Sequence, residues 1–461
     1  MNEITKRKQP SIDLSNYDLD GMEAADYLSQ YVQQASVTGD ELEAGQFFAN
    51  LCRNAGLHVE MFNEEKGMIN FASSLYPLSS KKPNIIFVNH VDVVEAGNEQ
   101  KWKYPPFSGE IAEGFVWGRG AYDNKGAAIV QFTGIKPFVD LAKDHDLPYN
   151  ITMVSVCAEE TFGDHGAKQV VENHLDLLNP VLVVGEGPVG VRGVVPSKPE
   201  QLLFGISVAH KHCLWLELSM EVEGTGHGSV PPLQYANKEM VKALNELVTT
   251  KPKLQFNKIN VQTIDVLGDL EGGLKGFIMK KISFFKPILT PVIRKIPIFT
   301  ALFSNTITVS NIRSEGTAHN AIPQKVVTKL DCRLLPETKR EDFIAYVKSI
   351  IKNDEIKIKV VKQTPSAEPT DHNNPFFDEL SVAIKKVYPD AHVFPMLAPN
   401  ASDCNAFRSK GVLTLSTVPV EMTKEVLDCI HAPNERMPIE ALIKGRKVIT
   451  AFLESILNFK S

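Results

Sequence analysis

The sequence predicts an α/β protein with a mixed, mostly parallel sheet, helices on both faces of that sheet, and an inserted α+β sandwich domain. Short apolar runs rich in β-branched residues alternate with helical patterns in the first half of the chain, as in parallel sheets covered on both faces. The second half carries the order strand, helix, strand, strand, helix, strand. The chain of 461 residues is also longer than one hydrophobic core usually holds, so we expect two domains.

Composition and charge are those of an ordinary globular protein. Hydrophobic residues make up 43% of the chain and charged residues 23%, which argues against a disordered or fibrous protein. The formal net charge is only -6 and Lys and Arg do not cluster, so we expect no nucleic-acid partner. The six cysteines are scattered, and residues 1–20 contain no apolar core of a signal peptide. We therefore expect a cytoplasmic protein.

The first element that the sequence defines is an amphipathic helix. Residues 38–41 (TGDE) have the form of a capping box, and apolar residues follow at helical spacing until Gly56 offers a C-terminal stop.

Buried strands are predicted where apolar runs are bounded by polar groups. Helical patterns at residues 126–141 and 166–178 separate the first three of these strands. The strands are expected at residues 85–88, 151–156, 181–184 and 412–415. We expect the catalytic domain to comprise residues 1–205 and 364–461.

The second domain is expected at residues 206–363, where the pattern changes to a partly alternating strand. Its elements are expected at residues 214–222 (strand), 237–248 (helix), 306–312 and 325–333 (strands), 340–352 (helix) and 356–361 (strand).

Residues that can bind metal follow the predicted strands at their carboxyl ends, where open α/β sheets usually place their sites. His90 and Asp92 follow the first strand, Glu159 and Glu160 the second, and Glu186 the third. Catalytic zinc accepts imidazole nitrogen and carboxylate oxygen and keeps one position for water. These residues therefore form a candidate metal site.

Several of these positions have two interpretations. Asp123 precedes a predicted helix, so it is either an N-cap or the carboxylate that bridges two metal ions. Glu159 and Glu160 point different ways in an extended segment, so one can bind metal while the other acts as general base, although paired glutamates are also common on solvated surfaces. Asp92 can accept the second N–H of His90, but a single histidine at a strand end is often only a surface residue.

Five motifs in a fixed order carry a resemblance to a known family. The chain resembles the zinc metallopeptidases that include aminoacylase, acetylornithine deacetylase, succinyl-diaminopimelate desuccinylase and glutamate carboxypeptidase, over nearly its whole length. The motifs are residues 89–94 (NHVDVV), 118–126 (GRGAYDNKG), 158–160 (AEE), 185–186 (GE) and 431–435 (HAPNE).

The resemblance implies a zinc-exopeptidase-like catalytic domain that binds two Zn²⁺ per subunit, with Co²⁺ or Mn²⁺ as substitutes. His90 and Glu186 would complete one zinc site and Glu160 and His431 the other, with Asp123 bridging them. It further implies that Glu159 is the general base, that Asp92 supports His90, and that the peptide bond between Asp123 and Asn124 is cis.

The second domain resembles the family's lid and dimerisation domain. Residues 226–229 (GHGS) match a lid motif whose histidine reaches the partner subunit's site, so we expect a homodimer in which His227 stabilises the oxyanion; the alternative is a turn histidine. Asn320 and Arg333 match positions that hold the substrate's carboxylate, while a surface salt bridge is an equal alternative for Arg333. Ser402 and Asp403 match a late motif near the site.

Residues 102–109 (WKYPPFSG) and 116–120 (VWGRG) are most similar to the branch that contains carboxypeptidase S and the N-acyl amino acid hydrolases. An apolar, basic insertion at about residues 266–304 supports this branch, and its basic residues interrupt any run long enough to span a membrane. We expect its helices to line a pocket for an acyl chain or bulky side chain, or to rest on a membrane surface. The alternative is that they pack on the lid or at the dimer contact.

Together these patterns predict an enzyme that hydrolyses the amide bond of a small peptide or an N-acyl amino acid. Water activated at two zinc ions would attack the carbonyl, with Glu159 as general base. Carboxypeptidase, dipeptidase and aminoacylase activities all stay open. The alternatives are a non-catalytic protein that binds peptides or acyl amino acids, and an amide synthase that runs the reverse reaction.

Overall fold

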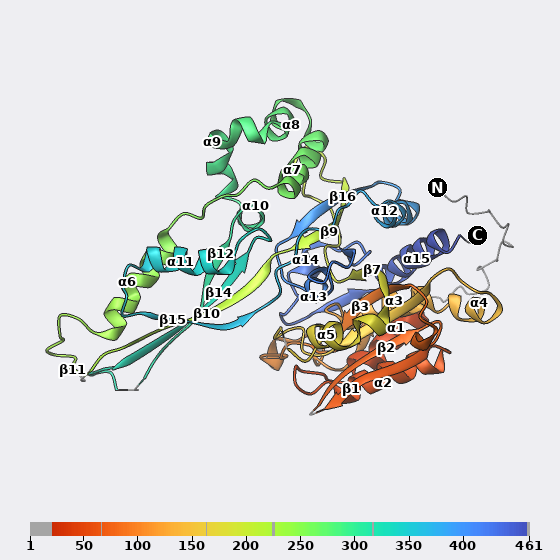
Figure 1. The fold of residues 1–461 in the computed structure, drawn as a ribbon, viewed down its shortest axis with the longest axis horizontal. Coiled ribbons are helices and arrows are strands. Elements are labelled where there is room, and N and C mark those ends of the chain that lie inside the picture. Colours follow the sequence, from red (N-terminus) through yellow and green to blue (C-terminus); the bar gives the residue numbers. More distant parts are fainter. Residues whose placement is uncertain (1–20, 66, 163, 224–225, 316–317, 459–461) are drawn as a thin grey trace.

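The computed structural model describes residues 21–65, 67–162, 164–223, 226–315 and 318–458. The predicted lack of a signal-peptide core concerns residues 1–20, which lie outside the described residues. A large sheet with its helices forms one body, and a smaller sheet with its own helices extends from it (Figure 1).

The large sheet has nine strands in the order β1-β2-β6-β3-β7-β17-β9-β16, with β8 paired to β9. The central strands β6, β3, β7 and β17 are mutually parallel. The pairs β1 with β2, β2 with β6, and β17 with β9 are antiparallel. The predicted mixed, mostly parallel sheet is therefore confirmed. The strands are β1 (His58–Glu65), β2 (Met68–Ser74), β3 (Asn84–His90), β6 (Asn150–Val156), β7 (Pro180–Gly185), β8 (Gly190–Val191), β9 (Leu202–His210), β16 (Ala391–Ala398) and β17 (Thr414–Ser416).

Helices cover both faces of this sheet, which explains why its central strands are apolar without alternation. Along β3, Ile85 and Phe87 join one core, while Ile86 and Val88 join another on the opposite face. The first core is shared with α1 (Gly21–Val32), α2 (Leu42–Asn54), α3 (Lys125–Ile135), α12 (Pro375–Val387) and α15 (Ile439–Ile456), and the second with α5 (Ala167–Leu178) and α13 (Cys404–Arg408).

Two local predictions are wrong. The helix expected at residues 126–141 is divided into α3 and α4 (Phe138–Asp144), because Pro137 between them has no N–H to continue the first helix. The capping box at residues 38–41 does not form, since α2 has Glu41 as its N-cap residue. The Thr38 hydroxyl instead donates a hydrogen bond to Asp92 at 2.8 Å.

The smaller sheet is antiparallel, in the order β12-β14-β10-β15, and α6 and α11 pack on it around a separate core. The large sheet keeps β9 as far as His210, so the boundary expected between residues 205 and 206 falls inside that strand. The elements are β10 (His212–Glu221), α6 (Ala236–Thr249), β12 (Thr306–Ser314), β14 (Lys325–Leu334), α11 (Arg340–Ile351) and β15 (Lys357–Gln363), with a β-ribbon of β11 (Gly226–His227) and β13 (Ala321–Ile322).

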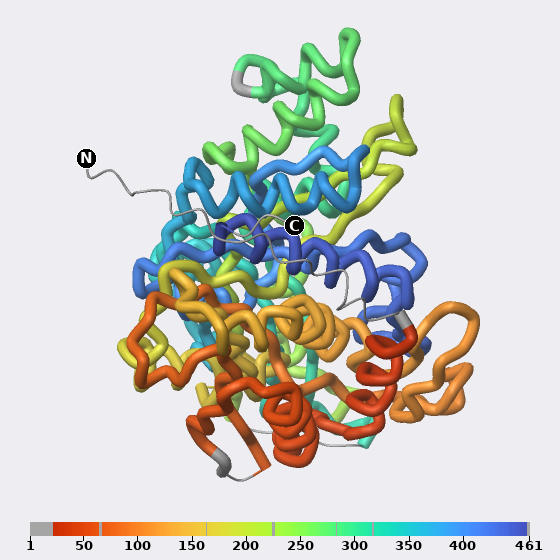
Figure 2. The backbone as a smooth tube through the Cα atoms, turned by 90° about the vertical axis from the view of Figure 1, so that its right-hand side faces the viewer, coloured from red at the N-terminus to blue at the C-terminus, as the bar shows by residue number. Residues whose placement is uncertain are grey.

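The insertion forms helices that project from the rest of the molecule, at the top of Figures 1 and 2. They are α7 (Lys258–Glu271), α8 (Gly273–Lys280) and α9 (Ile282–Ile293), and they are followed by α10 (Pro297–Phe303), which lies lower in Figure 1, next to the body of the molecule. Across the described part of the chain, no helix combines the length and apolar character needed to cross a membrane.

Short elements complete the fold and carry part of the site. They are β4 (Glu110–Ala112), β5 (Phe115–Trp117), β18 (Arg436–Pro438), α14 (Lys424–Leu427), and the 3-10 helices at Leu78–Ser80 and Glu99–Lys101. The strands among them form the sheet β18-β5-β4, which ties the His431 segment to the chain that leads into Asp123.

Candidate metal centre and active site

Parallel strands bring the predicted metal ligands to one edge of the large sheet. His90 is the last residue of β3, Glu160 follows β6, and Glu186 follows β7. Because β3 runs parallel to both of its neighbours, the three carboxyl ends lie together. Asp123 arrives in the loop before α3, and His431 in the loop after α14.

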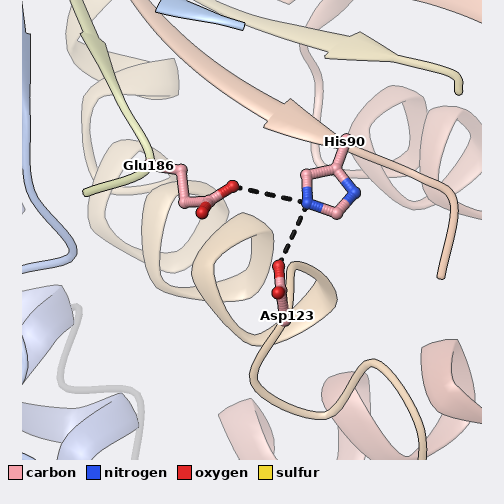
Figure 3. Close-up of side chains that lie close together, drawn as sticks. All are labelled: His90, Asp123 and Glu186. Carbon is pink, nitrogen blue, oxygen red and sulfur yellow. Dashed lines mark hydrogen bonds and ion pairs between the residues drawn. The ribbon is translucent and has the colours of Figure 1, made fainter. Parts of the chain in front are cut away.

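His90, Asp123 and Glu186 form the first set of candidate ligands (Figure 3). The Nε2 atom of His90 lies 3.1 Å from Oδ1 of Asp123 and 3.5 Å from Oε2 of Glu186. The His90 side chain is only 3% exposed, so these groups meet in a largely dry environment.

Asp123, Glu160 and His431 form the second set. The Nε2 atom of His431 lies 3.0 Å from Oδ2 of Asp123 and 3.1 Å from Oε1 of Glu160. Asp123 thus presents one carboxylate oxygen to each set, and within each set the candidate ligand atoms all lie within 4.8 Å of one another. This donor chemistry fits two divalent cations that share a bridging carboxylate.

Asp92 holds the segment that carries the adjacent glutamates. Its two carboxylate oxygens accept hydrogen bonds from the backbone N–H groups of Glu159 (3.0 Å) and Glu160 (3.1 Å). Nδ1 of His90 lies 2.9 Å from the backbone carbonyl oxygen of Asp92 and 3.4 Å from its carboxylate. These contacts leave Nε2 of His90 directed at Asp123 and Glu186, the other members of the first ligand set, as a metal ligand requires.

Glu435 holds the backbone of Asp123 by hydrogen bonds, as Asp92 holds that of Glu159 and Glu160. The sequence patterns assign no role to Glu435. Its Oε1 atom accepts hydrogen bonds from the backbone N–H groups of Tyr122 (3.1 Å) and Asp123 (3.0 Å), and its other oxygen pairs with Arg119. The side chains of Arg119 and Glu435 are 2% and 1% exposed. Both lie in family motifs, which was the only signal available for them. The peptide bond after Asp123 is cis, as the resemblance implied.

Glu159 is buried beside both candidate sets. Burial raises the pKa of Glu159 well above its ordinary value, and the negative charge of Glu186 raises it further. Ala158 precedes it with φ at +57°, a left-handed conformation that turns the chain after β6. Glu159 thus has its carboxyl group near the ligands without belonging to either set.

The surrounding carboxylates raise the pKa of both histidines. Burial would lower the pKa of His90, but hydrogen bonds with Asp123, Asp92 and Glu186 outweigh it and raise the pKa well above its usual value. Hydrogen bonds to Asp123 and Glu160 raise the pKa of His431 to about 10. For Asp123, burial is outweighed by His431 and His90, so its pKa is lowered.

The predicted lid residues lie away from this cluster within one chain. His227 is exposed on β11, at the far end of the small sheet from β3 and β7 (Figure 1). Nδ2 of Asn320 lies 3.3 Å from Nε2 of His227. Oγ of Ser229 lies 2.6 Å from Nδ1 of His227. A role for His227 in the partner's site stays a prediction.

Arg333 points to the catalytic domain but already has an acidic partner. Its Nε and Nη2 atoms donate to the two carboxylate oxygens of Asp331 at 2.9 and 3.0 Å, and its guanidinium lies 5.1 Å from the ring centroid of Phe162. Ser402 Oγ accepts a hydrogen bond from the backbone N–H of Cys404 at 3.3 Å. Burial raises the pKa of neighbouring Asp403 to about 7.

A mostly parallel α/β sheet with paired His/carboxylate sets and a spare buried carboxylate at its carboxyl edge is the arrangement expected of a metal-dependent hydrolase. The profile of peptidase family M20/M25/M40 matches residues 86–455. The chain belongs to this family, and it is therefore an enzyme of the peptidase and amidohydrolase kind.

Individual relatives agree with the branch that the sequence motifs indicated. The chain is 25% identical over 371 residues to the probable carboxypeptidase S-like 2 of Dictyostelium discoideum, covering 78% of this chain and 69% of that protein. It is 23% identical over 403 residues to the N-fatty-acyl-amino acid synthase/hydrolase PM20D1 of Mus musculus, covering 84% and 78%.

The fold is likewise similar to that of a solved structure of the family. The M20 family metallo-carboxypeptidase Sso-CP2 from Sulfolobus solfataricus superposes with a TM-score of 0.72 at 19% identity, covering 95% of this chain and 100% of that one.

Proposed function

We propose that this protein hydrolyses the amide bond of a small peptide or N-acyl amino acid at a two-zinc centre, with Glu159 as general base. The observation that carries the proposal is Asp123, whose two carboxylate oxygens each face a separate histidine within a complete ligand set. Co²⁺ and Mn²⁺ bind the same donor atoms, so the ligand sets alone do not select zinc. The identity of the metal as zinc is therefore part of the proposal.

Two divalent cations in these sets would polarise the scissile carbonyl and lower the pKa of a water molecule. Glu159 would take the proton of the attacking water and deliver it to the departing nitrogen. Its burial favours this role, because a raised pKa makes the carboxylate a stronger base toward the attacking water and lets the carboxyl group hold that proton until the departing nitrogen takes it. Asp92 and Glu435 would keep Glu159, Glu160 and Asp123 in position through their backbone N–H groups.

The remaining substrate contacts would come from the lid. In a homodimer, His227 from the other subunit would stabilise the oxyanion, with Asn320 beside it. Arg333 would bind the substrate's carboxylate by exchanging Asp331 for it, since a guanidinium can pair with either carboxylate in the same two-bond geometry. We propose the cytoplasm as the location of this protein.

The class of substrate follows from the relatives. The Dictyostelium discoideum relative is named as a probable carboxypeptidase S-like protein and the Mus musculus relative as an N-fatty-acyl-amino acid synthase/hydrolase. Both reactions act on an amide bond next to an amino acid. The second name also favours the reverse reaction, amide synthesis, as an alternative for this chain.

Glu159→Ala tests the mechanism. We expect the variant to retain the metal content of the wild type and to lose about 10²- to 10⁴-fold in kcat on dipeptides, N-acetyl amino acids and long-chain N-acyl amino acids. Glu113→Ala, at an exposed position, is the control. Hydrolysis by Glu159→Ala at the wild-type rate would contradict the assignment of the base.

The same substrate panel separates the alternatives. A wild-type protein that binds these compounds without turning them over would support the non-catalytic binding protein. Incubation with a free amino acid and a fatty acid, followed by product analysis, would reveal the synthase direction.

A further inference from the structure

Helix α9 is apolar on two opposite faces, although one of them faces solvent. On the inner face, Ile282 and Ile293 are 1% and 5% exposed and belong to the main hydrophobic core. On the outer face, Phe284, Ile288 and Val292 are 80%, 64% and 51% exposed. Their spacing of four residues places them in one stripe along the helix. A helix that is apolar all round is normally buried, so the outer stripe lacks a partner in the isolated chain.

Exposed apolar side chains also lie on the neighbouring helices. Leu274 and Phe277 are exposed on α8 at a spacing of three residues, and Ile298 is exposed on α10. We call these six side chains the outer apolar patch: Leu274, Phe277, Phe284, Ile288, Val292 and Ile298. Helices α8 and α9 project from the body of the molecule, at the top of Figures 1 and 2. An apolar patch in this position marks an interaction surface.

The segment that carries the patch is strongly basic. Residues 272–303 contain six Lys and Arg residues and no Asp or Glu, in a chain whose net charge is -6. Lys280 is paired with Asp269, and Lys286 lies over the ring of Phe256. In the part of the chain that the structure describes, the exposed side chains of Lys275, Lys281 and Lys295 form no ion pair.

The charge decides which partner fits. A second copy of the chain, docked face to face, would place this basic segment against itself, and like charges oppose such a contact. An anionic phospholipid bilayer supplies both missing components, a negative headgroup layer for the lysines and an acyl boundary for the apolar side chains. We propose that α8, α9 and α10 dock this protein on an anionic phospholipid membrane through the outer apolar patch.

This docking does not depend on the reaction catalysed, so it is tested by binding. The wild-type protein is sedimented with vesicles of phosphatidylcholine alone and with equimolar phosphatidylcholine and phosphatidylserine. We expect binding to the anionic vesicles that weakens as salt is added. The variant Phe284→Ser/Ile288→Ser/Val292→Ser should lower the partition coefficient at least about tenfold.

Matched variants control for surface changes elsewhere. Val241→Ser/Val248→Ser removes two exposed apolar side chains from α6 and should bind like the wild type. Lys275→Glu/Lys281→Glu/Lys295→Glu leaves the apolar stripe intact and should also lose binding to anionic vesicles about tenfold or more. It keeps the test decisive if the serine variant fails to fold. Lys357→Glu/Lys359→Glu, on β15, is its control.

Three results would overturn the proposal. One is a wild-type protein that does not sediment with anionic vesicles. Another is equal binding by the wild type and by the charge-reversal variant. The third is self-association of the wild type, abolished by the serine variant, without vesicle binding, which would assign the patch to a second copy of this chain.

Discussion

Asp92 is the residue on which the geometry of both ligand sets depends. Its carboxylate accepts the backbone N–H groups of Glu159 and Glu160, the Thr38 hydroxyl donates to it, and it lies beside Nδ1 of His90. A single buried side chain thus orients one ligand of each set and the proposed base.

Asp92→Asn replaces one oxygen by an amide NH₂ that faces other donors. We expect the affinity for Zn²⁺ to fall about 10- to 100-fold, because supporting hydrogen bonds of metal ligands typically contribute that much. Titration of the demetallated protein with Zn²⁺ measures this. Thr38→Val removes a single donor to the same carboxylate and should have a smaller effect. An unchanged affinity in Asp92→Asn would show that Asp92 does not position the ligands.

The buried ion pair of Arg119 and Glu435 should contribute to the free energy of unfolding. Glu435→Ala leaves the Arg119 guanidinium charged, buried and without its carboxylate, which costs about 3 to 5 kcal/mol in the free energy of unfolding. Urea denaturation in the presence of a chelator measures this without a contribution from metal binding. Glu113→Ala breaks the exposed pair with Lys103 and should leave the midpoint nearly unchanged. A similar midpoint for both variants would contradict the prediction.

Sequence motifs identified the five candidate ligands, Asp92 and Glu159, because these residues directly follow recognisable strands or lie in ordered motifs. They did not reveal what Thr38, Arg119 and Glu435 do. Those side chains act by tertiary contacts, such as the hydrogen bond from Asp123 to Glu435 across 312 residues, which no local pattern encodes. For Thr38 the sequence pattern instead predicts a helix cap, since a hydroxyl before a helix has that signature.

Helix α3 is the element that fixes the bridging carboxylate. Gly126, three residues after Asp123, lies so close to the preceding loop that an added Cβ would be 2.2 Å from the carbonyl oxygen of Ala121. Backbone atoms cannot rotate away as a side chain can. The start of this helix is therefore locked to the loop that carries Asp123.

Gly126→Ala should shift this junction, lowering the free energy of unfolding by about 1 to 3 kcal/mol and weakening metal binding. Gly134→Ala is the matched control, because its Cβ would meet the side chain of Ile449 on α15 at 2.6 Å, two turns away from the site. We expect Gly134→Ala to lose stability but to keep its metal affinity. If Gly126→Ala bound Zn²⁺ like the wild type, the junction would not control the bridge.

At the level of elements, strands with continuous apolar runs and helices with clear periodicity were predictable. The division of α3 from α4 differs from the single predicted helix because the apolar spacing continues across Pro137, although that proline is itself a helix-break signal in the sequence. The strands β1, β2, β9 and β16 were also not predicted, because their place in the sheet depends on pairing with distant segments. Helices in the insertion were expected, but their exposed outer face depends on packing.

For the whole molecule, the position of His227 distinguishes a monomeric from a dimeric active site. Glu159→Ala and His227→Ala should each be inactive alone. Random reassociation makes about half of the dimers mixed, each with one complete site, so a mixture should recover about a quarter of the wild-type activity.

The matched control is a mixture of Glu159→Ala with Asp123→Asn, whose defects both lie within one subunit's ligand cluster, so that no mixed dimer holds a complete site. No recovery in the first mixture, with mixed dimers verified by their mass, would show that His227 does not act in the partner's site.

The shared carboxylate is tested most directly by the metal stoichiometry of the demetallated protein titrated with Zn²⁺ in a calorimeter. We predict about two ions for the wild type, about one for His431→Ala, which keeps the set of His90 and Glu186, and loss of tight binding at both positions for Asp123→Ala. An Asp123→Ala protein that still bound two Zn²⁺ with wild-type affinity would contradict the bridged centre.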